Sequence, residues 1–186
     1  MSSYLSDSTL ECDLDPIDRR IIATLQADGR LSNVELAERV GLSPSPCLRR
    51  VKRLEREGYI AAYRAALQRS RIGLGLTVFV GVQIESHADE RCEAFQGTIV
   101  AMPEVVACHL VSGETDYLLE VVVPDLEHYQ RFLLGKLLNL AIIKEVRSNI
   151  AIQTLKEAGP LPLAHLKPPP PRRGKDADQQ KPTRRH

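Results

Sequence analysis

The residues with the clearest chemical potential are basic side chains within residues 44–57. This range contains five basic residues and only two glutamates. The basic residues are Arg49, Arg50, Lys52, Arg53 and Arg56. Guanidinium and ammonium groups bind DNA phosphates, and arginine also reads base edges in the major groove. Cys47, Val51 and Leu54 repeat at helical spacing, which predicts one buried stripe with the charges on the other faces. We therefore favour a DNA-contacting helix over an ordinary surface helix with solvated charges.

A tight turn precedes this helix. Ser32 is placed to cap a helix over 33–40, Gly41 is suited to a turn, and Ser43 is placed to cap the basic helix, which opens with Pro44. Two short helices joined in this way are typical of a helix-turn-helix, whose second helix enters the major groove. We predict DNA contacts from Ser43, Ser45, Pro46, Arg49, Arg50, Lys52 and Arg53.

A third helix is predicted to support this pair. Leu14, Ile17, Ile21 and Leu25 repeat at helical spacing after Asp15-Pro16, and Asp28-Gly29 ends the pattern. Residues 14–58 then form a three-helix domain, preceded by a flexible N-terminus over 1–13. A domain of this size buries little surface, so we expect support from another domain or chain.

The pattern changes to period two at Leu76. We predict strands over 76–84, 105–111, 117–123 and 143–155, with helices marked by 92–102 and 126–140. The order βαββαβ over 76–157 is the ferredoxin-like arrangement, so the chain belongs to the α+β class. Apolar residues on both faces of the strands predict a partner sheet. Residues 59–75 are predicted to be a linker strand and hinge.

The charge distribution separates three regions. Residues 1–69 carry 11 basic and 10 acidic side chains, residues 70–159 carry 7 and 12, and residues 160–186 carry 7 and 2. The last region also holds seven of the twelve prolines. We interpret 158–186 as a Pro-rich basic tail, disordered or polyproline-like beyond about residue 166, and solvated more readily than bound to DNA.

Several function classes find no support in the sequence. It has no Walker or Rossmann glycine loop, and Cys108 and His109 are neighbours on a strand, so they point to opposite faces. The cysteines and histidines lack metal-ligand spacing, and a redox role for Cys47 is the weaker alternative. We expect no enzyme activity, no catalytic residues, no metal and no cofactor. Without a signal region or a membrane span, the chain is expected to be cytoplasmic.

Long ordered motifs in both halves resemble the Lrp/AsnC (feast/famine) family of bacterial transcriptional regulators. The resemblance covers about residues 14–157 and rests on Leu14-Asp15-x-Ile17-Asp18-Arg19-x-Ile21, Leu25-Gln26-x-Asp28-Gly29-Arg30, the stretch Gly41–Glu55, Met102-Pro103-Glu104-Val105, and Gly113-Glu114-x-Asp116-Tyr117-Leu118-Leu119. It implies a helix-turn-helix domain joined to a ferredoxin-like domain for effector binding and oligomerisation. It also implies sheet-to-sheet dimers, often octamers of four dimers.

The resemblance further implies that a small amino acid binds near the 113–117 loop. Gly113 permits a turn with accessible amides, Asp116 complements an α-ammonium group, and Tyr117 offers a ring and a hydroxyl. By residue types alone, an ordinary hairpin turn is the better explanation of this loop, and only the resemblance favours the effector site. The effector residues expected from the resemblance are Gly113, Glu114, Thr115, Asp116, Tyr117 and Ser148.

We therefore expect a nucleoid-associated regulator that binds double-stranded DNA sequence-specifically. A small amino acid is expected to change its assembly and DNA affinity, with genes of amino-acid metabolism or transport as targets. The alternative is an architectural protein that compacts DNA without effector control. A saturable, amino-acid-dependent change in DNA affinity separates the two.

Overall fold

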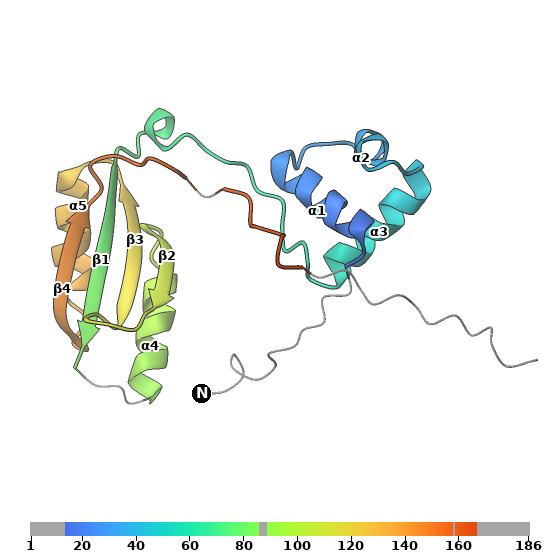
Figure 1. The fold of residues 1–186 in the computed structure, drawn as a ribbon. Helices are drawn as coiled ribbons and strands as arrows, with labels where there is room; N and C mark the ends of the chain where they lie inside the picture. The colour runs from blue at the N-terminus through green and yellow to red at the C-terminus, as the bar shows by residue number, and fades with distance from the viewer. Residues whose placement is uncertain (1–13, 86–88, 158, 167–186) are drawn as a thin grey trace, which may run out of the picture. The chain divides into compact units, whose positions relative to one another are not determined.

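The computed structural model describes residues 14–85, 89–157 and 159–166, which fall into two compact units (Figure 1). Of the described residues, one unit holds 14–64 together with 159–166, and the other holds 65–85 and 89–157. The division lies inside the 59–75 region predicted as a linker. The predicted flexible N-terminus and the tail beyond residue 166 lie outside the described residues.

Three helices form the first unit, as predicted: α1 (Pro16–Ala27), α2 (Asn33–Val40) and α3 (Pro44–Arg56). Asp15 caps α1 by accepting from the Ile17 and Asp18 amides, and Ser32 caps α2 in a reciprocal box with Glu35. Gly41 ends α2 at φ 72°, a left-handed conformation that glycine adopts without steric cost. Local chemistry thus determines where each of the first two helices begins.

The core of this unit is the predicted apolar stripe. Its buried members come from all three helices and the residue before them: Leu14, Ile21, Leu36, Ala37, Val40, Cys47 and Leu54. Val51, Ile17 and Leu25 are only partly buried against it. The helical spacing in the sequence therefore identified the contacting faces correctly.

One charged residue lies inside this core. Asp18 has no exposed surface, and its carboxylate accepts from Arg50 Nη1 at 2.8 Å and from Arg53 Nη2. It also accepts the Asp15 amide at 3.2 Å, which completes the cap of α1. A buried carboxylate is tolerated only when its charge and lone pairs are matched, and here α3 supplies the matching charges.

The linker does not contain the predicted strand. Residues 61–68 have no regular structure, and a short 3₁₀ helix, η1 (Arg69–Ile72), follows. A strand needs a neighbour to satisfy its amides and carbonyls, and no described segment of the chain pairs with this one.

The second unit is the predicted ferredoxin-like domain. Its strands β1 (Leu76–Ile84), β2 (Val105–Leu110), β3 (Tyr117–Val123) and β4 (Ile143–Ile150) form one antiparallel sheet in the order β2-β3-β1-β4. The predicted last strand, 143–155, was too long. It ends at Ile150, which pairs with Val78. Since β1 begins only two residues before Val78, it offers almost no strand for later residues to pair with.

The helices and the sheet share one core. α4 (Asp89–Val100) contributes Phe95 and Ile99, and α5 (Leu126–Phe132) contributes Tyr129 and Phe132. The predicted second helix is not regular throughout, because a π-helical turn, η2 (Leu133–Leu137), follows α5. The wider turn places Leu137 on the same side as Phe132, five residues earlier, and both are buried.

None of the helices in the described ranges combines the length and the apolar character needed to cross a membrane.

We predict that Asp18→Asn destabilises the helical domain without altering the sheet domain. Losing the charge leaves Arg50 and Arg53 without their shared partner. The cost should be roughly 2–3 kcal/mol, below that of a fully buried pair because the two arginine side chains remain 27% and 32% exposed. Thermal unfolding of the full chain, followed by circular dichroism at 222 nm, measures it. Glu38→Gln, an exposed carboxylate on α2, is the control, and equal stability of both variants would contradict the role of Asp18.

Candidate nucleic-acid interface and effector site

The first turn of α3 combines two serine hydroxyls with prolines, which have no amide hydrogen to donate. Ser43 occupies the N-cap position, as predicted, but its hydroxyl makes no capping bond. An N-cap hydroxyl accepts from the second or third helical amide, and the third position is Pro46, which has no N–H. Ser43 is thus the N-cap residue that the sequence predicted, but the side-chain capping bond expected of a serine there is absent. Ser43 and Ser45 are exposed and Pro46 is partly buried, so this turn presents hydroxyls at the surface.

A side-chain amide adds a hydrogen bond to the apolar contact between α2 and α3. Asn33 Nδ2 donates to the Pro44 carbonyl at 2.8 Å, which joins the first turns of the two helices. This bond supports the angle at which α3 leaves the turn.

The basic residues of α3 divide into two groups. Arg49 and Lys52 are exposed and form no ion pair with a described residue. Arg50 and Arg53 are partly buried and bind the Asp18 carboxylate, and Arg50 also binds Asp15 at 2.6 Å. The structure thus leaves Arg49 and Lys52 without an ion pair to a described residue, while Arg50 and Arg53 hold α3 against α1.

The ion pair with Arg50 also helps to lower the pKa of Asp15. Partial burial favours a higher pKa for Asp15, but bonds from the Asp18 amide and Arg50 outweigh it and hold the pKa of Asp15 below its ordinary value. A lowered pKa stabilises the folded state above the ordinary value of 3.8, and this stabilisation is lost as the pH falls through the lowered pKa. The α1–α3 contact is therefore expected to weaken only in strong acid.

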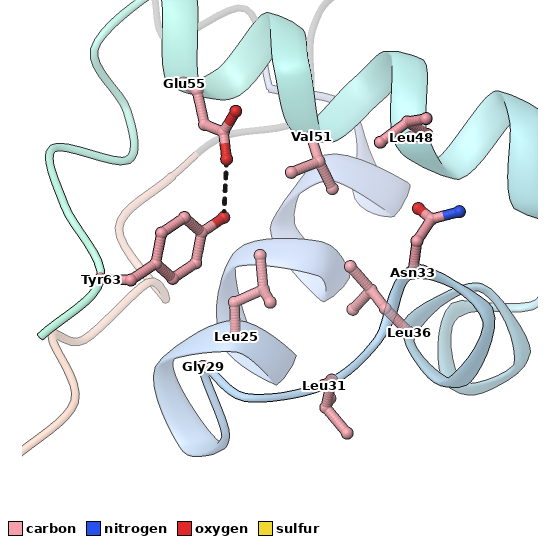
Figure 2. A pocket seen from close by; sticks show the side chains of 9 residues that line it. All are labelled: Leu25, Gly29, Leu31, Asn33, Leu36, Leu48, Val51, Glu55 and Tyr63. Carbon is pink, nitrogen blue, oxygen red and sulfur yellow. Dashed lines mark hydrogen bonds between the residues drawn. The ribbon is translucent and has the colours of Figure 1, made fainter. Parts of the chain in front are cut away.

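A hollow of about 240 Å³ lies among the three helices of the first unit (Figure 2). Leu25, Leu36 and Val51 contribute apolar walls, and Tyr63 enters from the linker. The Tyr63 hydroxyl donates to Glu55 Oε1 at 2.9 Å, so the start of the linker is bound to α3. Burial, together with the neighbouring Glu55, raises the pKa of Tyr63 to about 12. This contact is stable at neutral pH and is lost only as the pH rises from 10 towards 12.

The predicted effector loop is anchored to β1. Asp116 Oδ2 accepts the Ile84 amide at 2.9 Å, and the Asp116 amide donates to the Val82 carbonyl at 2.9 Å. Gly113 has φ 136°, which other residues rarely adopt. The turn is therefore held in a fixed conformation rather than lying loose at the end of a hairpin.

Two residues at this loop were not identified from the sequence. A Cβ at Gly81 would lie 2.8 Å from Thr115 Cγ2, so Thr115 packs over the bare backbone of β1. Arg147 on β4 binds Glu114 of the loop and, at 2.8 Å, Glu145. Only the β1–β4 pairing, in which Gly81 lies opposite Arg147, brings these residues together, and their spacing in the chain carries no such signal.

Two of the predicted effector residues lie elsewhere. Tyr117 is 3% exposed, with its ring 5.0 Å from that of Phe95 and its hydroxyl accepting from Gln96 at 3.0 Å. Ser148 Oγ is 2.5 Å from the Tyr129 hydroxyl on the helix-covered face. Ser148 and Arg147 are neighbours on a strand and point to opposite faces. The residues that the structure brings together at the 113–116 loop are Gly113, Glu114, Thr115 and Asp116, with Gly81 and Arg147.

The described residues contain no cluster of metal ligands, and neither the Cys47 nor the Cys108 thiol has a lowered pKa. No three histidine, cysteine, aspartate or glutamate side chains gather there as metal ligands would. Burial raises the pKa of the Cys47 and Cys108 thiols, which lowers their thiolate content and hence their reactivity.

Comparison with known families assigns both units. A model described as the winged helix-turn-helix DNA-binding domain matches residues 14–61, and a model described as the Lrp/AsnC ligand-binding domain matches residues 77–161. The matches coincide with the α1–α3 unit and with the sheet domain. They confirm the predicted α+β fold with its N-terminal DNA-binding and C-terminal ligand-binding domains.

Similar proteins point the same way. The leucine-responsive regulatory proteins of Escherichia coli (strain K12) and Salmonella typhimurium are each 44% identical over 149 residues, which cover 80% of this chain and 91% of theirs. A Neisseria meningitidis transcriptional regulator solved in complex with L-Met has a TM-score of 0.79 and 42% identity, covering 83% of this chain and 99% of that one. An AsnC family regulator from Agrobacterium tumefaciens has a TM-score of 0.77 and 38% identity, covering 80% and 97%. These relatives are regulators of transcription and not enzymes.

We predict that Arg49→Ala and Lys52→Ala weaken DNA binding while leaving stability unchanged. Each lost phosphate contact should flatten the dependence of log affinity on log salt by about one unit, whereas loss of a base contact should reduce sequence preference. Fluorescence anisotropy with a labelled duplex, titrated at several salt concentrations, measures both quantities.

Arg50→Ala is the informative comparison. It should lower the melting temperature because it removes a partner of Asp18, and its effect on DNA binding should follow from that loss. Arg131→Ala, an exposed arginine on α5, controls for a general change of charge. An Arg50→Ala protein with wild-type stability and DNA affinity reduced as in Arg49→Ala would assign Arg50 to DNA instead.

Proposed function

The chain belongs to the Lrp/AsnC family of transcriptional regulators, and we propose that it binds operator DNA through α3 and responds to a small amino acid at the 113–116 loop. The observation that carries this proposal is the division of α3, with Arg49 and Lys52 exposed beside a first turn of exposed serines. The amino-acid response rests on the fixed Asp116 loop in the matched ligand-binding domain.

In the proposed DNA complex, the first turn of α3 approaches the base edges. The hydroxyls of Ser43 and Ser45 can donate to or accept from bases, while Arg49 and Lys52 bind bases or phosphates. Asp18 holds α3 through Arg50 and Arg53, so the helix enters the groove as a rigid element. A dimer then reads two half-sites about one helical turn, or a multiple of it, apart.

The effector proposal follows from charges at the loop. Asp116 complements an α-ammonium group, and Arg147 complements an α-carboxylate if the ligand competes with Glu114 for it. A carboxylate accepts several hydrogen bonds, so the bond from the Ile84 amide does not preclude a ligand contact. The similar Neisseria regulator was solved with L-Met, which supports an amino acid as the ligand class. Such a ligand acts only if it binds one assembly better than another.

Self-association is the third part of the proposal. Phe79, on the sheet face opposite the core helices, is 41% exposed, and beyond β4 Ile152 and Leu155 are 100% and 88% exposed. Exposed apolar residues mark a protein interface when they form one patch. We propose that the Phe79 face of the sheet and the segment after β4 together form a dimer contact, and that four such dimers form an octamer.

As a DNA-binding regulator, the protein is proposed to act in the cytoplasm at the nucleoid, on genes of amino-acid metabolism or transport. An architectural protein that only compacts DNA would bind without regard to amino acids. The response to an effector therefore decides between these two functions.

We predict that Asp116→Ala abolishes the amino-acid response while leaving basal DNA affinity within a few-fold of wild type. Losing a charge-assisted bond should weaken effector binding roughly 10- to 100-fold. Gly81→Ala should act in the same direction, because its methyl group displaces Thr115 and with it the loop. A thermal-shift screen of the twenty amino acids identifies the effector, and anisotropy with and without it measures the response.

Glu93→Ala, an exposed carboxylate on α4, is the matched control and should respond as wild type does. An unchanged response in Asp116→Ala would move the site away from this loop. A wild-type protein whose DNA binding ignores every amino acid would favour the architectural alternative.

We predict that the purified protein has a molar mass of two or eight times its 20.7 kDa chain mass. Ile152→Asp should shift the population towards smaller species, since a charge replaces a fully exposed apolar side chain at the proposed contact. Sedimentation velocity measures both, with Lys156→Asp as a control for added negative charge nearby. A monomeric wild-type protein would contradict the proposed assembly.

A further inference from the structure

One exposed residue on α3 is apolar. The other apolar residues of this helix, Cys47, Val51 and Leu54, form its core stripe, whereas the Leu48 side chain is 42% exposed. Within the part of the chain that the structure describes, Leu48 is not among the residues that pack against the helical core. A single exposed leucine is ordinary, so its place on the helix decides whether it has a role.

Leu48 lies within the surface proposed to meet DNA. It follows Ser45 by three residues and precedes Lys52 by four, so the three side chains share one stripe of α3. Arg49 comes next in the chain, and Ser45, Arg49 and Lys52 are all exposed. Arg49 and Lys52 form no ion pair with a described residue. The leucine is therefore flanked by a hydroxyl and two cations that are suited to DNA.

Residues of α2 support Leu48 from its other side. Leu48 and Leu36 both line the hollow of the first unit, together with Asn33 (Figure 2). Asn33 Nδ2 donates to the Pro44 carbonyl at 2.8 Å, one turn before Leu48. The turn of α3 that carries Leu48 is therefore held to α2 by both apolar and polar contacts.

The chemistry of the major groove limits what a leucine can recognise. Adenine, guanine and cytosine present hydrogen-bond donors and acceptors there, whereas thymine adds an apolar group, the C5-methyl. A leucine neither donates nor accepts, and packing it on a polar edge removes the hydrogen bonds which that edge makes to water. The base contact that suits Leu48 best in this groove is therefore the thymine methyl.

We propose that Leu48 packs against the C5-methyl group of one thymine in each half-site and so contributes to operator specificity. Ser45 and Lys52, on the same stripe, contact the DNA on either side of that thymine. The proposal rests on DNA binding by α3 but is independent of the effector. A leucine that only closes the edge of the hollow would not distinguish thymine from uracil, and this difference makes the test possible.

The first experiment removes the methyl group from the DNA. An operator is selected from random duplexes with the wild-type protein, and each thymine is then replaced by deoxyuridine, one symmetric pair of positions at a time. Uracil pairs as thymine does and lacks only the methyl. At one position, affinity measured by fluorescence anisotropy should fall about fourfold for each half-site, which is the effect of burying one methyl group.

The second experiment removes the leucine. Leu48→Ala should bind the thymine and uracil duplexes about equally at that position. Leu48→Met keeps an apolar side chain of similar volume and should keep the preference for thymine. Leu48→Gln should shift the preference towards adenine, whose edge pairs with a side-chain amide. A Leu48→Ala protein that prefers thymine over uracil by the wild-type factor would overturn the proposal.

Controls distinguish base reading from folding. Leu126→Ala, which changes an exposed leucine on α5, should leave both affinities unchanged. Since Leu48 lies outside the core, thermal unfolding of Leu48→Ala should give a melting temperature close to that of the wild type. A lowered melting temperature with an equal loss of affinity for thymine and uracil duplexes would show a structural role instead and overturn the proposal.

The outcomes also separate this proposal from the proposed function. A wild-type protein that selects no operator from the random duplexes would overturn both, because Leu48 would then have no site to read. A selected operator that is bound equally well with uracil at every position would overturn the role of Leu48 alone, and operator binding through α3 would stand.

Discussion

The buried Asp18 carboxylate is the interaction on which the DNA-binding half depends. It completes the cap of α1 and binds two arginines of α3, so one side chain connects the start of one helix with the length of another. Such a charge is costly to bury alone and is tolerated only with its partners in place. The rigidity of the recognition helix therefore rests on arginines that sequence composition assigns to DNA.

Contacts between residues far apart in the sequence also hold the loop of the ligand-binding half. The 113–116 loop takes its conformation from β1, through the Ile84 amide and the bare backbone of Gly81, and its charge balance from Arg147 on β4. A sheet brings these segments together at fixed spacing, which short loops by themselves cannot do. In both candidate sites, residues at the surface are held in place by other residues that are buried or ion-paired.

Elements with local signals were predictable. Helical periodicity located α1, α2 and α3, and alternation located β1 and β3 to the residue. The errors occurred where a partner decides the outcome. The predicted linker strand has no described neighbour, and β4 ends where β1 begins. Ser43 is a local case, because Pro46 removes one of the two amides from which its hydroxyl could accept, and the proline is visible in the sequence.

Sequence alone determined the two domains, the order of their elements, the family resemblance and the presence of a basic helix, because periodicity, caps and motifs are properties of neighbouring residues. Tertiary structure decided which basic residues remain available. Arg49 and Arg50 are adjacent and chemically identical in the sequence, yet one is exposed and the other binds Asp15 and Asp18. The physical reason is helical geometry. Successive residues on a helix project about 100° apart, and only the packing of α1 against α3 determines which of the two directions meets a carboxylate.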